Sequence, residues 1–246
     1  MKIALLGDVH ANLPALDSVL AHASSQNVSA IWNTGDFLGY GAFPNEVVES
    51  LRQAGAISIL GNYDLKVLGF KEKDKKWRKN KRAEKYLAFQ WAYQNLSREN
   101  RRYLKSLPEQ RQLELAGKSV LLTHASPESN EEPLGPATPQ ERLIELAHLA
   151  GTDVVICGHS HQPFSRTVAN TLFINPGSVG RPDDGDPRAC YAILEAAQVE
   201  LHVGHYRLEY DLYRAVTGIR ENGLPEAFAQ MILKGHDLDT ILQEKT

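Results

Sequence analysis

Short apolar runs recur along this chain, and each of them ends in glycine or in a polar residue. Their lengths, their richness in Val, Ile and Leu and their bounding glycines are typical of buried β-strands. Most are hydrophobic almost throughout, which indicates strands that are covered on both faces. Six runs share these properties: Lys2–Leu6, Ala30–Thr34, Ala56–Leu60, Ser119–Thr123, Asp153–Cys157 and Thr171–Ile174.

Segments with helical periodicity lie between these strands. The first, Leu13–Ser24, follows Asn12, a residue suited to cap a helix N-terminus, and it places Leu16 and Val19 on one face. The alternation of strand and helix predicts an α/β fold in a single domain, residues 1–246. Further helices are predicted at Pro44–Gln53, Ala83–Tyr93, Arg98–Leu107, Pro139–Leu149 and Glu221–Lys234, and further strands at Tyr191–Leu194 and Val199–Val203.

The composition sets broad limits on function. The formal net charge of the 246 residues is −3 and 42% of them are hydrophobic, so nothing global indicates a nucleic-acid or membrane partner. The run Lys2–Leu6 is too short for a membrane span or a signal peptide. Cys157 and Cys190 are the only cysteines, too few for a disulfide framework, and this favours a cytoplasmic location.

Residues that can bind a metal ion follow the predicted strands at several of their carboxyl ends. Ligand sites of α/β sheets form at this edge, where a loop aims the side chain and the strand holds the backbone. The mixture of oxygen and nitrogen ligands favours Mn, Fe, Co, Ni or Zn over Mg or Ca. Seven residues make up this predicted ligand set: Asp8, His10, Asp36, Asn62, His124, His159 and His161.

The same residues lie in five short motifs whose order is informative. The motifs are Gly7-Asp8-Val9-His10, Gly35-Asp36, Gly61-Asn62-Tyr63-Asp64, Thr123-His124 and Gly158-His159-Ser160-His161. In that order they resemble the calcineurin-like metallophosphoesterase superfamily, in particular its bacterial and archaeal branch of small phosphodiesterase-like members. The resemblance implies a four-layer α/β/β/α sandwich of two mixed sheets, with helices outside and metals at one edge.

The resemblance also implies two divalent metal ions and a division of the ligands between them. Asp36 would bridge both ions, and Mn²⁺ is the first expectation, with iron, nickel, cobalt and zinc as alternatives. The implied reaction is hydrolysis of a phosphodiester or phosphomonoester by a metal-bridging hydroxide, with a small phosphorylated, nucleotide-type substrate. One ion would bind Asp8, His10 and His161, and the other Asn62, His124 and His159.

The third motif departs from the family pattern. The family usually carries His at the position of Tyr63, where Asp64 would orient the ring and the His would act on the leaving oxygen. A phenol with a pKa near 10 can donate a hydrogen bond but cannot supply an imidazolium, so a catalytic role of Tyr63 implies slow turnover of poor leaving groups. A second departure is Gly39, where the family often carries Asp.

Two further features leave alternatives open. Arg181 either clamps a substrate phosphate together with Asn62 or is an exposed structural residue. The turn Asn175–Gly180, which precedes Arg181, either binds phosphate through its backbone N–H groups or is only structural. The segment Lys71–Lys85 holds nine basic residues against three acidic ones and forms either a solvated face or a surface that steers nucleotides or RNA towards the site.

The alternative to an enzyme is an interaction module that binds metal in the same fold but has little or no turnover. Tyr63 favours this alternative, whereas the complete ligand set opposes it. The sequence leaves the oligomeric state open.

Overall fold

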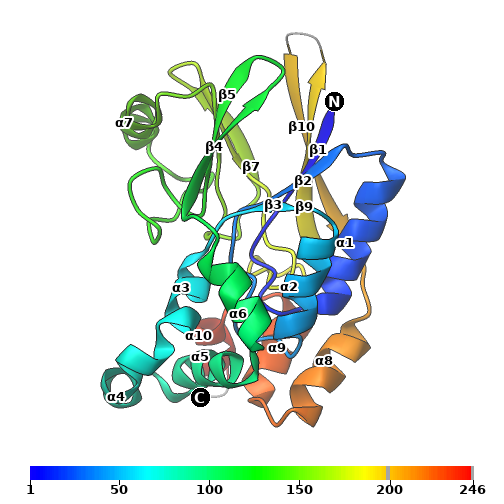
Figure 1. Ribbon diagram of the computed structural model, residues 1–246, viewed down its shortest axis with the longest axis vertical. Helices are drawn as coiled ribbons and strands as arrows, with labels where there is room; N and C mark the ends of the chain where they lie inside the picture. The colour runs from blue at the N-terminus through cyan, green and yellow to red at the C-terminus, as the bar shows by residue number, and fades with distance from the viewer. Residues whose placement is uncertain (198–199, 245–246) are drawn as a thin grey trace.

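Two five-stranded mixed sheets form the centre of the structure, a computed structural model that describes residues 1–197 and 200–244 (Figure 1). In the first sheet, β1, β2 and β3 are parallel, and β9 and β10 extend the sheet in antiparallel order. Its strands in spatial order are β10 (Glu200–Leu208), β9 (Ala189–Ala197), β1 (Lys2–Leu6), β2 (Ala30–Asn33) and β3 (Ile57–Ser58).

The second sheet repeats this mixture of directions. Its three central strands, β5, β6 and β8, are parallel, and an antiparallel strand closes each edge. The spatial order is β4 (Gln110–Leu115), β5 (Lys118–Thr123), β6 (Val154–Ile156), β8 (Thr171–Asn175) and β7 (Phe164–Val168).

The covering of both faces explains why the strands are hydrophobic throughout. In β1, Ile3 and Leu5 belong to the core between the two sheets, whereas Ala4 and Leu6 belong to the core under the outer helices. A side-chain period of two sends these pairs to opposite faces. The helices of the two outer layers are α1 (Leu13–Ser25) and α2 (Pro44–Gln53) on the first sheet and α7 (Gln140–Ala150) on the second. The four-layer α/β/β/α sandwich is therefore confirmed.

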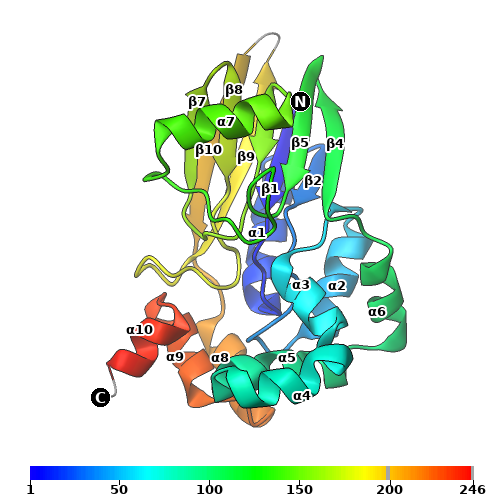
Figure 2. The same cartoon turned by 90° about the vertical axis from the view of Figure 1, so that its left-hand side faces the viewer.

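A second group of helices lies at the end of the sheets that is opposite the N-terminus (Figures 1 and 2). Strand β1 starts at the N-terminus, so its carboxyl end points towards these helices. Helices from two distant parts of the sequence meet here, and Arg82 and Lys85 at the start of α5 share Asp239 of α10. The group consists of α3 (Asn62–Leu68), α4 (Phe70–Asn80), α5 (Ala83–Asn95), α6 (Arg98–Lys105), α8 (Leu212–Glu221), α9 (Glu226–Lys234) and α10 (Leu238–Gln243).

Several sequence predictions about the elements were wrong. The predicted helix Glu221–Lys234 starts too early: Glu221 ends α8, Gly223 adopts a left-handed φ of 65°, and α9 begins after Pro225, at Glu226. The basic segment Lys71–Lys85 was expected to be a surface loop or an exposed helix start, and of these two the helical form is found, as α4 and the start of α5. The predicted strand Val199–Val203 begins outside the described residues, and its remainder falls within β10. Strands β4 and β7 and helices α3, α8 and α10 were not predicted.

None of the helices among residues 1–197 and 200–244 is both long enough and apolar enough to cross a membrane. The cytoplasmic location and the single domain stay predictions.

Candidate metal centre

Loops at the carboxyl ends of five strands carry the seven predicted ligands. Asp8 and His10 follow β1, Asp36 follows β2, and Asn62 follows β3 as the first residue of α3. The second sheet contributes His124 after β5, and His159 and His161 after β6. Because both sheets present their parallel strand ends at the same edge, residues far apart in the sequence can converge there.

Two groups of buried side chains at this edge have the geometry of a metal site. Asp8, His10 and His161 form one group, and Asp8, Asp36 and His124 form the other. Within each group, every residue offers one ligand atom, and these atoms lie within 4.8 Å of one another. The structure thus brings five of the seven predicted ligands together in two overlapping groups.

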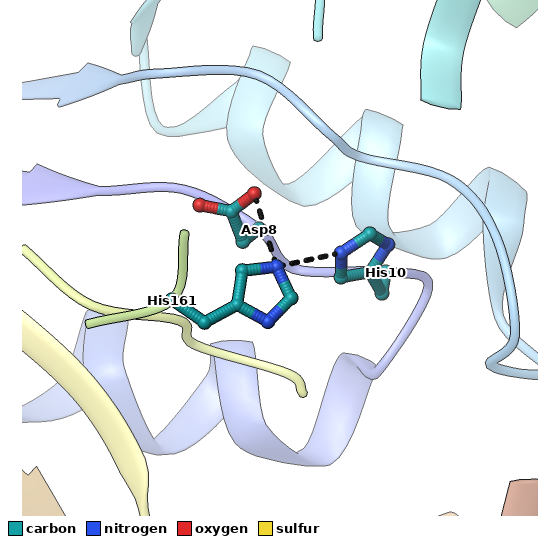
Figure 3. Close-up of side chains that lie close together, drawn as sticks. All are labelled: Asp8, His10 and His161. Atoms are coloured by element: carbon teal, nitrogen blue, oxygen red, sulfur yellow. Dashed lines mark hydrogen bonds and ion pairs between the residues drawn. The ribbon is translucent and has the colours of Figure 1, made fainter. Parts of the chain in front are cut away.

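In the first group, Asp8 and His10 both lie close to the Nε2 atom of His161 (Figure 3). This atom lies 3.4 Å from Oδ1 of Asp8 and 3.3 Å from Nε2 of His10. The three ligand atoms therefore point towards a common centre, as they would around one ion. Asp8 and His10 come from the loop after β1, whereas His161 reaches the site from the second sheet.

Asp36 belongs to the second group and also lies close to His10 of the first. Its Oδ2 atom is 3.8 Å from Nε2 of His10 and 3.6 Å from Nε2 of His124. Its other oxygen, Oδ1, accepts a hydrogen bond of 2.7 Å from the backbone N–H of Tyr63. One carboxylate therefore contacts histidines of both groups, which is the position that a bridging ligand requires.

Backbone carbonyls determine which ring nitrogen of each buried histidine can bind a metal ion. When Nδ1 donates to a carbonyl, Nε2 keeps its lone pair for a metal, and the ring is held in place. The three pairs are His10 with Leu38 at 3.0 Å, His124 with Thr34 at 2.9 Å and His161 with Arg181 at 2.7 Å.

The partly exposed His159 has the opposite arrangement. Its Nε2 lies 3.2 Å from the carbonyl of Glu131, so Nδ1 is the nitrogen that remains free for a ligand. The backbone N–H of the same residue donates to Oδ2 of Asp8 at 3.0 Å, which ties this loop to the first group.

Three buried polar atoms at the site lack a hydrogen-bond partner within the described residues. They are Oδ1 of Asp8, Oδ1 of Asn62 and Nε2 of His124. Buried polar groups are almost always satisfied, and leaving one unpaired costs about 1–3 kcal/mol. All three atoms are metal-ligating types, so the donor set fits divalent cations.

The protonation of the site reflects its burial and its crowding. Burial, together with the nearby charge of Asp8, raises the pKa of Asp36 to about 8. Burial would also raise the pKa of Asp8, but the charge of His161, whose Nε2 lies 3.4 Å from Oδ1, holds that pKa below the ordinary value. Burial lowers the pKa values of His10 and His124, which therefore stay neutral, as metal ligands must.

Five of the seven ligands adopt a left-handed backbone conformation. Their φ angles lie between 48° and 66°, a region that residues with a side chain seldom adopt. Such conformations cost about 1–3 kcal/mol each, persist only where the surroundings enforce them, and cluster at functional sites. The residues are Asp8, His10, Asp36, His159 and His161. Sequence patterns of strand and glycine do not contain this signal.

Close contact between two loops makes Gly61 indispensable to the position of Asp36. A Cβ atom added at Gly61 would lie 2.1 Å from Oδ1 and 2.4 Å from the backbone N of Asp36. We expect Gly61→Ala to displace Asp36 and to lower kcat/KM about 100-fold in the presence of Mn²⁺. Gly204→Ala on β10 is the control, because its Cβ would meet no atom closer than 3.4 Å. Equal activity of the two variants would contradict this role of Gly61.

Asp64 supports the site through the backbone. Its Oδ2 accepts from the N–H of Gly61 at 3.0 Å and its Oδ1 from the N–H of Leu38 at 3.1 Å. Asp64 thereby joins the loop of Asn62 to the loop of Asp36. Burial and the nearby Asp36 raise its pKa to about 8.

The Tyr63 side chain occupies the space that a larger residue at position 39 would need. A Cβ at Gly39 would lie only 2.8 Å from Cδ1 of Tyr63. The Tyr63 ring packs edge-on against His10 at 5.1 Å, and its hydroxyl is 2.8 Å from that of Tyr40. The two departures from the family pattern are therefore one packing arrangement.

Arg181 lies beside this tyrosine pair and is mostly buried, so its interpretation as an exposed residue was wrong. Its side chain is 14% exposed, and its guanidinium lies 5.0 Å from the centre of the Tyr40 ring. Asp183, which the sequence analysis missed, lies 3.7 Å from the Arg181 guanidinium and 3.4 Å from Nδ1 of His161. Within the described residues, Nε of Arg181 has no hydrogen-bond partner.

The turn Asn175–Gly180 supports the loop of Asp8. The N–H groups of Val179 and Gly180 donate to the carbonyls of Gly7 and Asp8, both at 3.1 Å, and the Ser178 hydroxyl donates to Asp8 at 2.8 Å. With these groups engaged, the structural interpretation of this turn is favoured over phosphate binding.

A sequence comparison connects this geometry to known proteins. The sequence model described as the calcineurin-like phosphoesterase superfamily domain matches residues 1–198. The chain belongs to the calcineurin-like phosphoesterase superfamily. The matched region contains all seven predicted metal ligands, and members of the superfamily use divalent metals.

Individual relatives within the superfamily match along most of the chain. An uncharacterized protein of Methanocaldococcus jannaschii is 33% identical, in an alignment that covers 95% of this chain and 98% of that protein. A phosphodiesterase of the same organism is 26% identical and covers 72% of this chain and 83% of its own. The crystal structure of a metallophosphoesterase from Sphaerobacter thermophilus has a TM-score of 0.79 at 31% identity and covers 96% of this chain and 99% of that one.

Proposed function

We propose that this protein is a two-metal-dependent phosphoesterase that hydrolyses phosphodiester or phosphomonoester bonds, with nucleotide-type substrates as the leading class. The observation that carries the proposal is the set of buried, unpartnered ligand atoms of Asp8, Asn62 and His124 around Asp36. A phosphodiesterase among the relatives supports the reaction class.

In this proposal, the ligands divide between two ions. Asp8, His10 and His161 hold one, and Asp36 is shared by both. The other ion is held by Asn62, His124 and His159. Mn²⁺ is the leading candidate because the ligands mix carboxylate, amide and imidazole groups, with iron, nickel, cobalt and zinc as alternatives.

Two divalent ions supply a water molecule of lowered pKa and offset the negative charge that gathers on the phosphoryl oxygens. The protein's own contribution is to hold the ligands rigidly, through the carbonyls behind the histidines and through Asp64 behind the loop of Asn62. Arg181 and the amide of Asn62 are the proposed contacts to the substrate phosphate. The unpaired Nε of Arg181 supports its part in this binding.

Tyr63 is the proposed partner of the leaving oxygen, as a hydrogen-bond donor. Burial and the neighbouring Tyr40 raise the pKa of the Tyr63 phenol well above its ordinary value. The phenol therefore stays protonated and can donate a hydrogen bond, but it releases its proton with difficulty. Esters whose leaving groups need no proton should be hydrolysed best.

We expect Tyr63→His to raise kcat/KM on an alkyl phosphodiester about tenfold or more, because an imidazolium can protonate a poor leaving group. The rate on the matched p-nitrophenyl ester should change little, since that leaving group departs as the anion. The measurement is the ratio of the two rates in both proteins. Tyr63→Phe, which removes only the hydroxyl, is the matched control and should not raise the alkyl rate. If Tyr63→His leaves the ratio unaltered, position 63 does not act on the leaving oxygen.

The direct test of the function uses Mn²⁺-loaded protein and two chromogenic substrates. Bis(p-nitrophenyl) phosphate and p-nitrophenyl phosphate share a leaving group but differ in the number of ester bonds. Turnover of either above the metal-free background supports the phosphoesterase, and the faster of the two identifies the preferred ester class. Background rates on both, with metal bound, would favour the interaction module.

A further inference from the structure

A strip of aromatic rings leads from the metal centre towards helix α4. The ring of Tyr63 lies 5.1 Å from that of His10 and 5.0 Å from that of Phe89, and Phe89 in turn lies 5.4 Å from Trp77, measured between ring centres. Phe89 is 2% exposed and Trp77 is 9% exposed. Trp77 is thus a core residue with no free face on which a nucleotide base could stack.

Lysine ammonium groups lie over this strip. Nζ of Lys66 is 5.3 Å from the centre of the Tyr63 ring, next to the metal ligands. Nζ of Lys81 lies over both following rings, 5.6 Å from Phe89 and 4.9 Å from Trp77, and Nζ of Lys73 is 5.4 Å from Trp77. Three cations therefore mark a path that starts at the metal centre.

The charge along this path is incompletely neutralised. Lys66 forms a salt bridge of 2.8 Å with Glu131, whose carbonyl also contacts the ring of His159. Neither Lys73 nor Lys81 forms a salt bridge with any residue in the described parts of the chain. Burial and the charges of Lys66, Lys85 and Lys73 lower the pKa of Lys81, whereas the charge of Glu131 opposes this effect. An anion bound here would relieve the repulsion between these lysines.

Local structure fixes the two unpaired lysines at the outer end of the strip. Lys73 and Trp77 are four residues apart in α4 and therefore lie on the same face. Lys81 follows the end of α4, and its backbone N–H donates to the carbonyl of Trp77 at 2.9 Å. Lys75 and Lys79 are two residues from Trp77 in either direction, which places them on the opposite, solvent-exposed face of the helix.

We propose that Lys73 and Lys81 bind a second phosphoryl group of the substrate, at a subsite beyond the phosphate that is hydrolysed. The inference rests on the proposed function and names its preferred substrates as small nucleotides that carry two separate phosphates. A phosphoryl group fits because it carries up to two charges and several acceptor oxygens, which suit more than one ammonium group. The basic segment as a whole is not required, because its outward-facing lysines point away from the strip.

The experiment compares two esters with the same leaving group: thymidine 5′-(p-nitrophenyl phosphate) with a free 3′-hydroxyl, and the same ester with a 3′-phosphate. In the Mn²⁺-loaded protein, kcat/KM should be about tenfold higher for the doubly phosphorylated ester, and this preference should shrink with salt. The double variant Lys73→Gln/Lys81→Gln should lose the preference and retain its rate on the ester with one phosphate.

Lys75→Gln/Lys79→Gln is the matched control, because it removes the same charge from the opposite face of α4. It should keep the preference. Equal rates on both esters in the unmodified protein, or equal loss in both double variants, would overturn the subsite. These outcomes differ from failure of the proposed function, in which neither ester is hydrolysed above background. The proposal would also be overturned if Lys73→Gln/Lys81→Gln, but not the control, hydrolysed both esters more slowly. The two lysines would then affect hydrolysis itself and not the binding of a second phosphate.

Discussion

Replacing Asp36 by Asn is expected to lower kcat/KM on bis(p-nitrophenyl) phosphate by about 1,000-fold or more. The carboxylate contacts His10 and His124 through one oxygen and the Tyr63 N–H through the other. An amide of the same shape keeps the packing but has no negative charge, so it is a much weaker ligand for two cations. Loss of about 4 kcal/mol of charge stabilisation in the transition state corresponds to this factor.

Asp17→Asn is the matched control for this substitution. Asp17 is an exposed residue of α1 that pairs with Arg214 at 3.0 Å, so the same chemical change occurs far from the metal ligands. The control should retain full activity and its full metal content, and the metal content of both variants is measured by elemental analysis. We expect less than two metal ions per chain in Asp36→Asn. Full activity of this variant would rule out a bridging role for Asp36.

Removal of the metals should abolish turnover and lower the melting temperature. Ions that bind only the folded chain stabilise it by about 2.7 kcal/mol per site at a concentration of 100 times Kd. For a chain of this length, that energy corresponds to about 5–10 °C per site. Treatment with a chelator should therefore lower Tm by at least this amount, and Mn²⁺ should restore both Tm and activity.

The two measurements separate the phosphoesterase from a metal-binding interaction module. An enzyme recovers Tm and turnover together as Mn²⁺ is added. A module without turnover recovers Tm alone. If Mn²⁺ and the alternative metals raise neither quantity, the seven residues do not form a metal centre, and the proposed function fails.

The sequence predicted those elements of the fold that leave a clear pattern within a single short segment. Apolar runs closed by glycine or a polar residue identified six strands, because a strand covered on both faces leaves a strong local signal. Strand β4 (Gln110–Leu115) was missed because it lies at the edge of the second sheet and is mostly exposed, so it carries few apolar residues. Helix α3 was missed because Gly61 and Asn62 were assigned only to a metal motif, although Asn62 also begins a helix.

Five of the seven predicted ligands lie together in the structure, whereas the contacts that support them were not predictable. The histidines and aspartates stand at strand ends in a recognisable order. By contrast, the carbonyls of Thr34, Leu38 and Arg181 that orient them carry no side-chain signal in a sequence. The contact between Gly39 and Tyr63 and the placement of lysines over buried rings depend on side-chain packing between separate loops, and only the folded chain contains this information.

The left-handed backbone at five ligands has a consequence for how this protein would evolve or respond to engineering. Glycine adopts that conformation without strain, and asparagine adopts it more easily than most residues. A selection for thermal stability alone, with no demand for metal binding, should therefore replace Asp8, His10, Asp36, His159 and His161 by these residues in preference to positions of the hydrophobic core. In a related sequence, glycine at these positions would then mark a lineage that has given up the reaction while keeping the fold.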